Sequence, residues 1–131
     1  MTTSIEDFFG EAVFSYTRAQ AIDDGVLIDV SETAQEAGFK FNTVVTRAVW
    51  NDCIDWDNDS EQAYQDISGR LWDVLFMAAF NARRSEGSTS FFELYCIPQG
   101  KTKAALIKLK MVIGPGDTPE PVITIMLPDE D

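Results

Sequence analysis

The sequence LWDVLFMAAFNARR, residues 71–84, decides the fold, because it contains the clearest helical pattern in the chain. Its apolar residues recur with the period of about 3.6 that places them on one face of an α-helix. These residues are Leu71, Val74, Leu75, Ala78, Ala79 and Ala82. Arg83 and Arg84 then precede Gly87, and both cations and a left-handed glycine suit a helix C-terminus. The pattern predicts a central helix over residues 69–86.

The apolar period changes from about 3.6 to 2 after this helix. Three segments rich in aromatic and β-branched residues follow, at 90–97, 104–113 and 122–127. In the second of them Lys108 and Lys110 alternate with apolar residues, as expected of a half-buried strand. The connectors PQGKTK and GPGDTPEP have turn composition. We therefore expect three strands in an antiparallel meander that packs against the central helix.

The N-terminal half predicts a layer of shorter elements. We expect a short helix that opens at Ser4, a helix from Thr17 to Gly25, a strand at 26–30, a small helix from Ser31 to Gly38, a helix from Val44 to Cys53, a turn near Asp57 and a further segment at 59–67. The helix starts depend on capping pairs such as Thr17 with Gln20, and the helix after Val44 depends on apolar spacing.

These elements together predict one α+β domain over residues 1–131. A helical N-terminal part and one long helix are expected to pack on a three- to four-stranded antiparallel sheet. A chain of 131 residues is long enough to form a core without metal or disulfide cross-links. The tail PDED, residues 128–131, is expected to be a frayed anionic end.

Charge is unevenly distributed along the chain, whose formal net charge is −12. Residues 1–82 hold 15 Asp and Glu against four Lys and Arg, whereas residues 83–111 hold six Lys and Arg against two acids. A surface that repels phosphates gains no counterion-release energy, so direct binding to nucleic acid is disfavoured. Anionic lipid surfaces are disfavoured for the same reason. A basic protein is the partner that this charge favours.

The cysteines and the apolar segments indicate a reduced, cytoplasmic protein. Cys53 and Cys96 are the only cysteines, and the N-terminus lacks the basic patch and apolar run of a secretory signal. The longest apolar stretch, at 71–80, is interrupted by Asp73 and is too short to cross a bilayer. We therefore expect no membrane association.

The segment 50–66, WNDCIDWDNDSEQAYQD, is the sharpest local anomaly, because it carries six acids and no Lys or Arg. On a helix, Asp52, Asp55 and Asp59 would rise by roughly 4.5 to 6 Å per step, which is comparable to the spacing of phosphates along a nucleic-acid strand. Trp56 adds an aromatic side chain of the kind that anchors interfaces. The alternative is an ordinary solvated acidic face with helix-capping carboxylates.

The other constellations in the sequence are weaker. Asp55, Asp57 and Asp59 have the first spacings of an EF-hand loop, but the required Gly and final Glu are absent, so we expect no metal site. GPGD at 114–117 lacks the Lys and Ser or Thr of a phosphate loop and is expected to be a turn. The chain has no His to activate a nucleophile such as Cys53, so we expect no enzyme and no cofactor.

Five stretches of the chain resemble a known family. They are YTRAQAIDDGVLIDV (16–30), EAGFKF (36–41), TRAVW (46–50), SGRLWDVLFMAA (68–79) and GPGDTPEPVITIMLP (114–128). The chain is similar to small acidic bacterial proteins of uncharacterised function that occur on plasmids, phages and other mobile elements. The resemblance implies a genetic setting and brings no catalytic or binding residue. Small acidic products of mobile elements often inhibit host defence proteins.

The sequence therefore leads to one main hypothesis of function. The chain is expected to be a non-enzymatic inhibitor of the anti-CRISPR or anti-restriction kind, which mimics nucleic acid and binds a basic host protein. The expected contact residues are Asp23, Asp24, Asp52, Asp55, Trp56, Asp57, Asp59 and Glu61.

Two other hypotheses stay open. One is a small nucleotide- or metabolite-binding protein or enzyme with Arg18, Arg47 and Arg70 around a pocket. The other is an accessory protein of plasmid maintenance that acts as an oligomer paired through its sheet edge.

Overall fold

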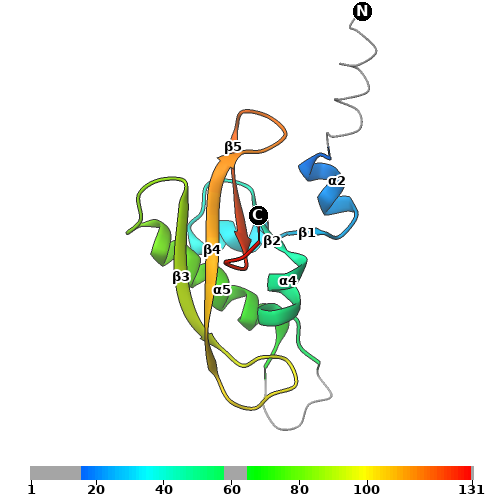
Figure 1. Ribbon diagram of the computed structural model, residues 1–131, viewed down its shortest axis with the longest axis vertical. Helices are drawn as coiled ribbons and strands as arrows, with labels where there is room; N and C mark the ends of the chain where they lie inside the picture. The colour runs from blue at the N-terminus through cyan, green and yellow to red at the C-terminus, as the bar shows by residue number, and fades with distance from the viewer. Residues whose placement is uncertain (1–15, 58–64, 131) are drawn as a thin grey trace, which may run out of the picture.

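The computed structural model describes residues 16–57 and 65–130 of the chain. Figure 1 shows a single twisted sheet with helices packed against it. The strands are β1 (Leu27–Asp29), β2 (Thr43–Thr46), β3 (Thr89–Cys96), β4 (Ala105–Pro115) and β5 (Pro121–Met126). The helices are α2 (Arg18–Asp23), α3 (Ser31–Ala37), α4 (Arg47–Val49), the π-helical turn η1 (Trp50–Ile54) and α5 (Ile67–Ala82). The expected α+β class is confirmed.

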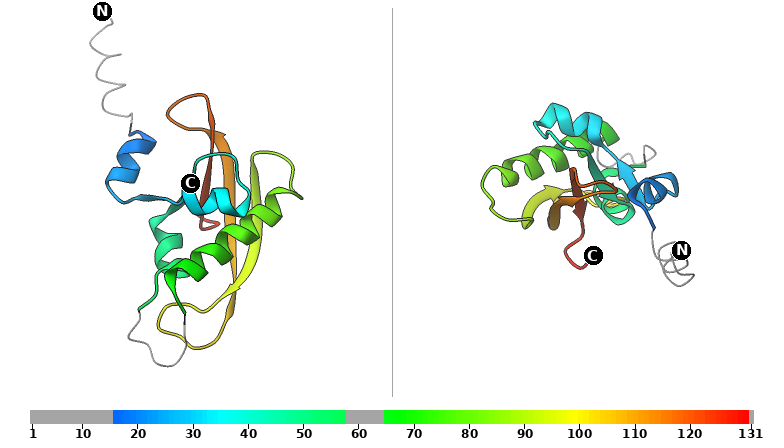
Figure 2. Two further views of the ribbon diagram at one scale, coloured as in Figure 1. Left: turned by 180° about the vertical axis from the view of Figure 1, so that it is seen from behind. Right: turned by 90° about the horizontal axis from the view of Figure 1, so that it is seen from above.

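The sheet has five strands in the order β1-β2-β5-β4-β3 among the described residues. Neighbouring strands are antiparallel except for β2 and β5, which run parallel. Helices α3 and α5 cover one face of this sheet (Figure 2). The core lies between that face and the helices, and its fully buried side chains include Leu75 of α5, Leu109 of β4 and Ile125 of β5. The three C-terminal strands are confirmed within two residues at each end.

The expected helix over Val44 to Cys53 is wrong in its first half. Residues 43–46 form β2, which pairs with both β1 and β5. The sheet therefore has five strands among the described residues, more than the expected three or four. All four residues of β2 are buried, so the run TVVT carries no exposed face on which a period could be read. A fully buried strand of β-branched residues looks like part of a helix by apolar spacing alone. Strands β3, β4 and β5 form the expected antiparallel meander. Because β2 pairs with β5 in parallel, the sheet as a whole is not antiparallel, as we had expected it to be.

The central helix is confirmed, but its ends differ from those expected. Helix α5 begins at Ile67, and the carboxylate of Asp66 accepts a hydrogen bond from the backbone N–H of Gly69 at 2.6 Å. Asp66 is therefore the N-cap. The helix ends at Ala82, so Arg83 and Arg84 lie just beyond its last turn. The side chains of its apolar stripe enter the core, which fixes α5 against β3.

The expected helix after Thr17 is confirmed as α2, with a complete capping box between Thr17 and Gln20. Asp117 adds a second cap from the turn before β5, because its two carboxylate oxygens accept hydrogen bonds from the backbone N–H groups of Arg18 (2.7 Å) and Ala19 (3.0 Å). The expectation that GPGD is a turn is therefore correct only in its second half, because Gly114 and Pro115 still belong to β4 and the turn that holds α2 begins at Gly116. Helix α3 is also confirmed and ends at Gly38, whose φ of +111° favours glycine.

The C-terminal tail is not frayed up to residue 130. The carboxylate of Glu130 accepts hydrogen bonds from the hydroxyl of Thr46 (2.7 Å) and the backbone N–H of Leu127 (2.8 Å), and Lys110 donates to the backbone carbonyl of Glu130. The expected helix at Ser4 and most of the segment at 59–67 lie outside the described residues. None of the helices within residues 16–57 and 65–130 combines the length and apolarity needed to cross a bilayer.

Candidate functional site

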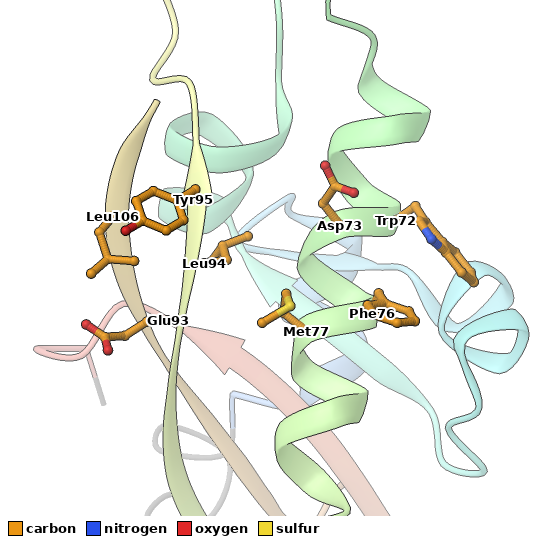
Figure 3. Close-up of a pocket in the computed structure, with 8 residues that line it drawn as sticks. All are labelled: Trp72, Asp73, Phe76, Met77, Glu93, Leu94, Tyr95 and Leu106. Carbon is orange, nitrogen blue, oxygen red and sulfur yellow. The ribbon is translucent and has the colours of Figure 1, made fainter. Parts of the chain in front are cut away.

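A groove lies between α5 and β3 on the described surface. Its volume is about 540 Å³. It is lined by Trp72, Asp73, Phe76, Met77, Glu93, Leu94, Tyr95 and Leu106. Figure 3 shows Asp73 and Met77 pointing from α5 toward β3, and Leu94 pointing back toward α5. The same view places Trp72 and Phe76 on the opposite flank of α5, and Tyr95 and Leu106 beyond β3, so apolar groups extend past both walls.

Helix α5 carries a second apolar stripe that does not enter the core. Trp72, Phe76 and Phe80 follow each other at i, i+4 and i+8 and are 38, 50 and 45 % exposed. The rings of Trp72 and Phe76 lie 6.1 Å apart between centroids, so they form one aromatic surface. Three large aromatic side chains in a row on a helix leave apolar area in contact with water, which is a feature of binding surfaces.

Strand β3 lies at the edge of the sheet and leaves backbone groups open beside the groove. The N–H of Ile113 donates to the carbonyl of Ser88 at 2.7 Å, so these two residues form a hydrogen-bonded pair. Hydrogen-bonded and non-hydrogen-bonded pairs alternate along antiparallel strands, so this pair decides which residues of β3 direct their N–H and C=O groups toward β4. The outward-pointing backbone groups then belong to Thr89, Phe91, Glu93 and Tyr95. We find no hydrogen bond from residues 16–57 or 65–130 to these groups. At the next outward position, Arg70 donates to the carbonyl of Ile97 at 2.7 Å, so Arg70 closes one end of the open edge.

The groove is acidic as well as apolar. Asp73 and Glu93 are both exposed, and its lining contains no Lys or Arg. Asp52 and Asp55 lie toward the same end of α5, since the charge of Asp52 acts on Cys96 and the charge of Asp55 acts on Arg70. Four carboxylates therefore lie in or next to the groove, which favours cationic groups on whatever binds there.

A smaller cavity of about 160 Å³ adjoins the groove and shares Asp73, Leu94 and Tyr95 with it. Arg70 lines this cavity and is 3 % exposed. Its guanidinium donates to the carbonyls of Ile54 (2.9 Å) and Ile97 (2.7 Å) and stacks on the ring of Trp56 at 4.7 Å. Burial lowers the pKa of Arg70 from its ordinary value, and neighbouring thiols and carboxylates oppose that shift.

The same small cavity is lined by both cysteines of the chain. Cys53 of η1 is buried, Cys96 at the end of β3 is half-buried, and both are free thiols. Hydrogen bonding to Cys53 lowers the pKa of Cys96 to about 7, against the opposing effect of burial and with help from the positive charge of Arg70. The same hydrogen bond, together with burial, raises the pKa of Cys53 above the ordinary range. Cys96 is therefore the more readily ionised thiol of the pair.

The acidic residues expected to contact a partner do not form one helical row. The helical segment ends at Ile54, and Asp55 has extended backbone angles, so the expected spacing of Asp52, Asp55 and Asp59 along a helix is wrong. The last bond of the π-helical turn runs from the Asp55 N–H to the carbonyl of Trp50 at 2.7 Å, five residues back. Asp52 and Asp57 are exposed and Asp55 is half-buried, whereas Asp59 and Glu61 lie outside the described residues.

Trp56 is not available to a partner, because its side chain is only 4 % exposed and supports Arg70. The expectation that it anchors an interface is therefore wrong. Asp23 and Asp24 are exposed at the end of α2, where the hydroxyl of Tyr16 donates to Asp24 at 2.8 Å. Helix α2 packs on β1, the edge strand opposite to β3, so these two acids lie away from the groove.

The three arginines proposed for a common pocket are held by different partners. Arg18 donates to the hydroxyl of Thr124 (2.9 Å) and the carbonyl of Ile123 (2.8 Å), and Arg47 donates to the carbonyl of Gly25 (3.0 Å). Asp29, Asp117 and Glu120 also line the cavity beside Arg18, which disfavours an anionic ligand there. The cavity at Arg70 is well below the usual range of roughly 300–1,000 Å³ for ligand pockets. A nucleotide therefore finds no suitable site at Arg18 or Arg70.

No three His, Cys, Asp or Glu side chains gather closely enough to hold a metal ion within residues 16–57 and 65–130. The groove residues themselves were missed by the sequence reasoning, which treated α5 as a core helix. The signal that could have found them is the spacing of Trp72, Phe76 and Phe80, a second apolar stripe on a helix whose core stripe is already complete.

Comparisons with known proteins agree with the expectation of an uncharacterised family. Neither curated proteins nor solved structures contain a match to this chain. A family model described as "Family of unknown function (DUF6573)" matches residues 5–131, which is nearly the whole chain. The chain therefore belongs to this family of unknown function, DUF6573.

Proposed function

We propose that the chain is a non-enzymatic inhibitor that binds a basic, nucleic-acid-binding host protein through the groove between α5 and β3. The observation that carries this proposal is the combination of exposed aromatic side chains, an open strand edge and carboxylates at one place. Each feature is a known element of protein recognition, and the three adjoin one another here.

The apolar part of the groove supplies the affinity in this proposal. Trp72 and Phe76 expose about two fifths and one half of their side chains, and burial of such rings contributes about 25 cal/mol per Å² of apolar area. Trp and Tyr also dominate the residues whose truncation weakens interfaces most. We therefore expect the partner to insert an apolar side chain between Met77 and Leu94.

The open edge of β3 supplies the direction of binding. Outward backbone groups from Thr89 to Tyr95 pair with an extended segment of the partner, as in other complexes that add a strand to a sheet. The groove lies beside this edge, so alternate side chains of the added strand face it. Arg70 limits the length of that strand, because it already occupies the carbonyl of Ile97.

The charge supplies the choice of partner. Asp73 and Glu93 in the groove, with Asp52 and Asp55 next to it, favour a segment that carries Lys or Arg on either side of its apolar residue. Proteins that hold phosphates present such segments. Competition with nucleic acid for a basic surface is the way in which a small anionic protein encoded by a mobile element would inhibit host defence. The net charge of −12 supports this setting, which stays part of the proposal.

The test is a quantitative pull-down from a bacterial host lysate with four versions of the full chain. They are the wild type, Trp72→Ala with Phe76→Ala, Asp73→Asn with Glu93→Gln, and the charge-matched control Asp23→Asn with Asp24→Asn. Because loss of central interface aromatics typically costs 2 kcal/mol or more, we expect about 30-fold weaker capture by the aromatic variant. The Asp73 and Glu93 variant should lose capture mainly at low salt, and the α2 variant should behave as wild type.

Capture alone does not decide the proposal. The purified partner must bind nucleic acid, and the wild-type chain must release that nucleic acid while the aromatic variant does not. A partner that is captured equally by all four versions, or whose nucleic-acid binding is unchanged by the wild type, would contradict the proposal. Phe41→Ala is the control for loss of an exposed aromatic ring elsewhere, since Phe41 is 39 % exposed and does not line the groove.

A further inference from the structure

The only two cysteines of the chain line one cavity, although they are 43 positions apart in sequence. Cys53 comes from η1 and Cys96 from the last position of β3, and both line the cavity of about 160 Å³ beside the groove. Each thiol shifts the pKa of the other, as expected of two sulfurs that line one small cavity. Cys96 is half-buried, whereas Cys53 is 1 % exposed and lies behind it. A reagent at the mouth of the cavity therefore reaches the half-buried Cys96, whereas it has no comparable access to Cys53.

Arg70 gives this cavity a fixed positive charge. Two of its three guanidinium nitrogens donate to backbone carbonyls, but Nη2 is buried and has no hydrogen-bond partner in the described part of the chain. A buried donor without a partner is costly, so its presence beside two thiols is evidence of a site. The charges that act on the two sulfurs come from Arg70 on α5 and from Asp52 on η1. Arg70 favours the thiolate, and Asp52 opposes it.

We propose that Cys96 and Cys53 form a thiol–disulfide exchange site, which takes a low-molecular-weight disulfide such as oxidised glutathione as its substrate. The Cys96 thiolate attacks one sulfur of that disulfide, which forms a mixed disulfide on Cys96 and releases one thiolate. Cys53 then loses its proton and attacks the Cys96 sulfur, which forms the Cys53–Cys96 bond and releases the second thiolate. The two protein thiols are oxidised, and the small disulfide is reduced to two thiols.

Arg70 is a positioning residue in this exchange. Its guanidinium is fixed by the carbonyls of Ile54 and Ile97, which are the neighbours in sequence of Cys53 and Cys96 respectively. Arg70 therefore holds both cysteine-bearing segments against each other while its charge stabilises the Cys96 thiolate. The Cys53–Cys96 bond would then join η1 to the end of β3, at the end of the groove that Arg70 already closes.

The experiment treats the fully reduced full-length chain with oxidised glutathione and follows the products by intact-mass measurement and peptide mapping. For the wild type we expect a mixed disulfide on Cys96 that gives way to the internal Cys53–Cys96 disulfide. For Cys53→Ser we expect the Cys96 mixed disulfide to persist, because the second thiol is missing. For Cys96→Ser we expect no adduct on the same timescale, because Cys53 is buried.

The readout for Arg70 is the pH at which Cys96 reacts. In Arg70→Gln we expect the alkylation of Cys96 to require a higher pH than in the wild type, which a purely structural role of Arg70 would not produce. Circular dichroism establishes that each variant is folded, and the cysteine variants carry the test alone if Arg70→Gln is not. A wild type that keeps the glutathione adduct without forming the internal bond would overturn the proposal. Equal modification of Cys53 and Cys96 would overturn it as well.

Discussion

The two edge strands of the sheet are treated very differently by this chain. Strand β1 has three residues, and α2 packs on it. Strand β3 has eight residues, and its outward backbone groups from Thr89 to Tyr95 adjoin an apolar groove. Figure 1 shows α2 beside β1 at one side of the sheet, whereas β3 forms the opposite border. Proteins usually shorten or cover an edge strand because an open edge pairs with other chains.

The difference teaches that the open edge is not a general property of this fold. Helix α2 is held over one edge by a capping box at Thr17, a second cap from Asp117 and two hydrogen bonds that Arg18 donates. At the other edge it leaves the backbone open and adds exposed aromatic rings beside it. Because β1 is covered and β3 is open beside exposed apolar side chains, β3 is the edge suited to pairing with a partner.

Two neighbouring positions on β3 give the largest expected effect. The backbone N–H and C=O of Leu94 face β4 and its side chain enters the core. The backbone N–H and C=O of Glu93 face the open edge instead. Leu94→Pro should lower the free energy of unfolding by about 3 kcal/mol or more, because it removes a ladder hydrogen bond and core packing. Glu93→Pro should lower it by about 1 kcal/mol or less, because Pro is tolerated on an open edge.

Urea denaturation of the two proline variants measures this difference. Glu93→Pro should nevertheless abolish capture of the partner in the pull-down, since the outward N–H is lost. Equal destabilisation by the two substitutions would show that the alternation of β3 is misassigned and that its edge is not open at Glu93.

The covered edge is tested by Asp117→Ala. The substitution leaves the backbone N–H groups of Arg18 and Ala19 without their acceptor, and loss of such a cap costs about 1 to 2 kcal/mol. We expect a reduction of this size in the free energy of unfolding and faster amide hydrogen exchange in α2 and β1, with β3 unchanged. Glu120→Ala in the same turn is the control, because its side chain caps no helix in the described structure. Faster exchange in β3 would contradict the independence of the two edges.

The sequence predicted the elements that have one buried face and one exposed face, because apolar and polar residues then recur with a regular period. Helix α5 and strands β3, β4 and β5 alternate between buried and exposed residues, and the capping box at Thr17 marks α2 locally. Strand β2 could not be recognised in this way, because Thr43 to Thr46 are all buried and pair with strands from both ends of the chain. The cysteine pair likewise depends on contacts between distant segments. The acidic residues of segment 50–66 were visible in the sequence, but the helix ends at Ile54, before the turn expected near Asp57, so these residues do not follow one helix.

The smallest effect concerns the end of β3, where the two thiols change stability with pH. Cys96 has a pKa of about 7 in the folded chain and ionises at higher pH when unfolded, whereas the pKa of Cys53 is raised on folding. Between about pH 7 and the ordinary thiol value of 9.0, the unfolded chain binds more thiol protons, so this contribution to stability rises with pH. Above the ordinary value the unfolded chain loses both thiol protons while the folded chain keeps one, so the contribution falls.

Denaturant unfolding of the reduced chain across this pH range, compared with the variant that carries Cys53→Ser and Cys96→Ser, isolates the thiol contribution. The difference between the two proteins should rise from about pH 7, pass through a maximum and then fall. The size is small, because solvent reaches Cys96 and screens the charge of Arg70. A difference that falls steadily from pH 7 upward would mean that Cys96 does not ionise early, and β3 would then end in an ordinary buried thiol pair.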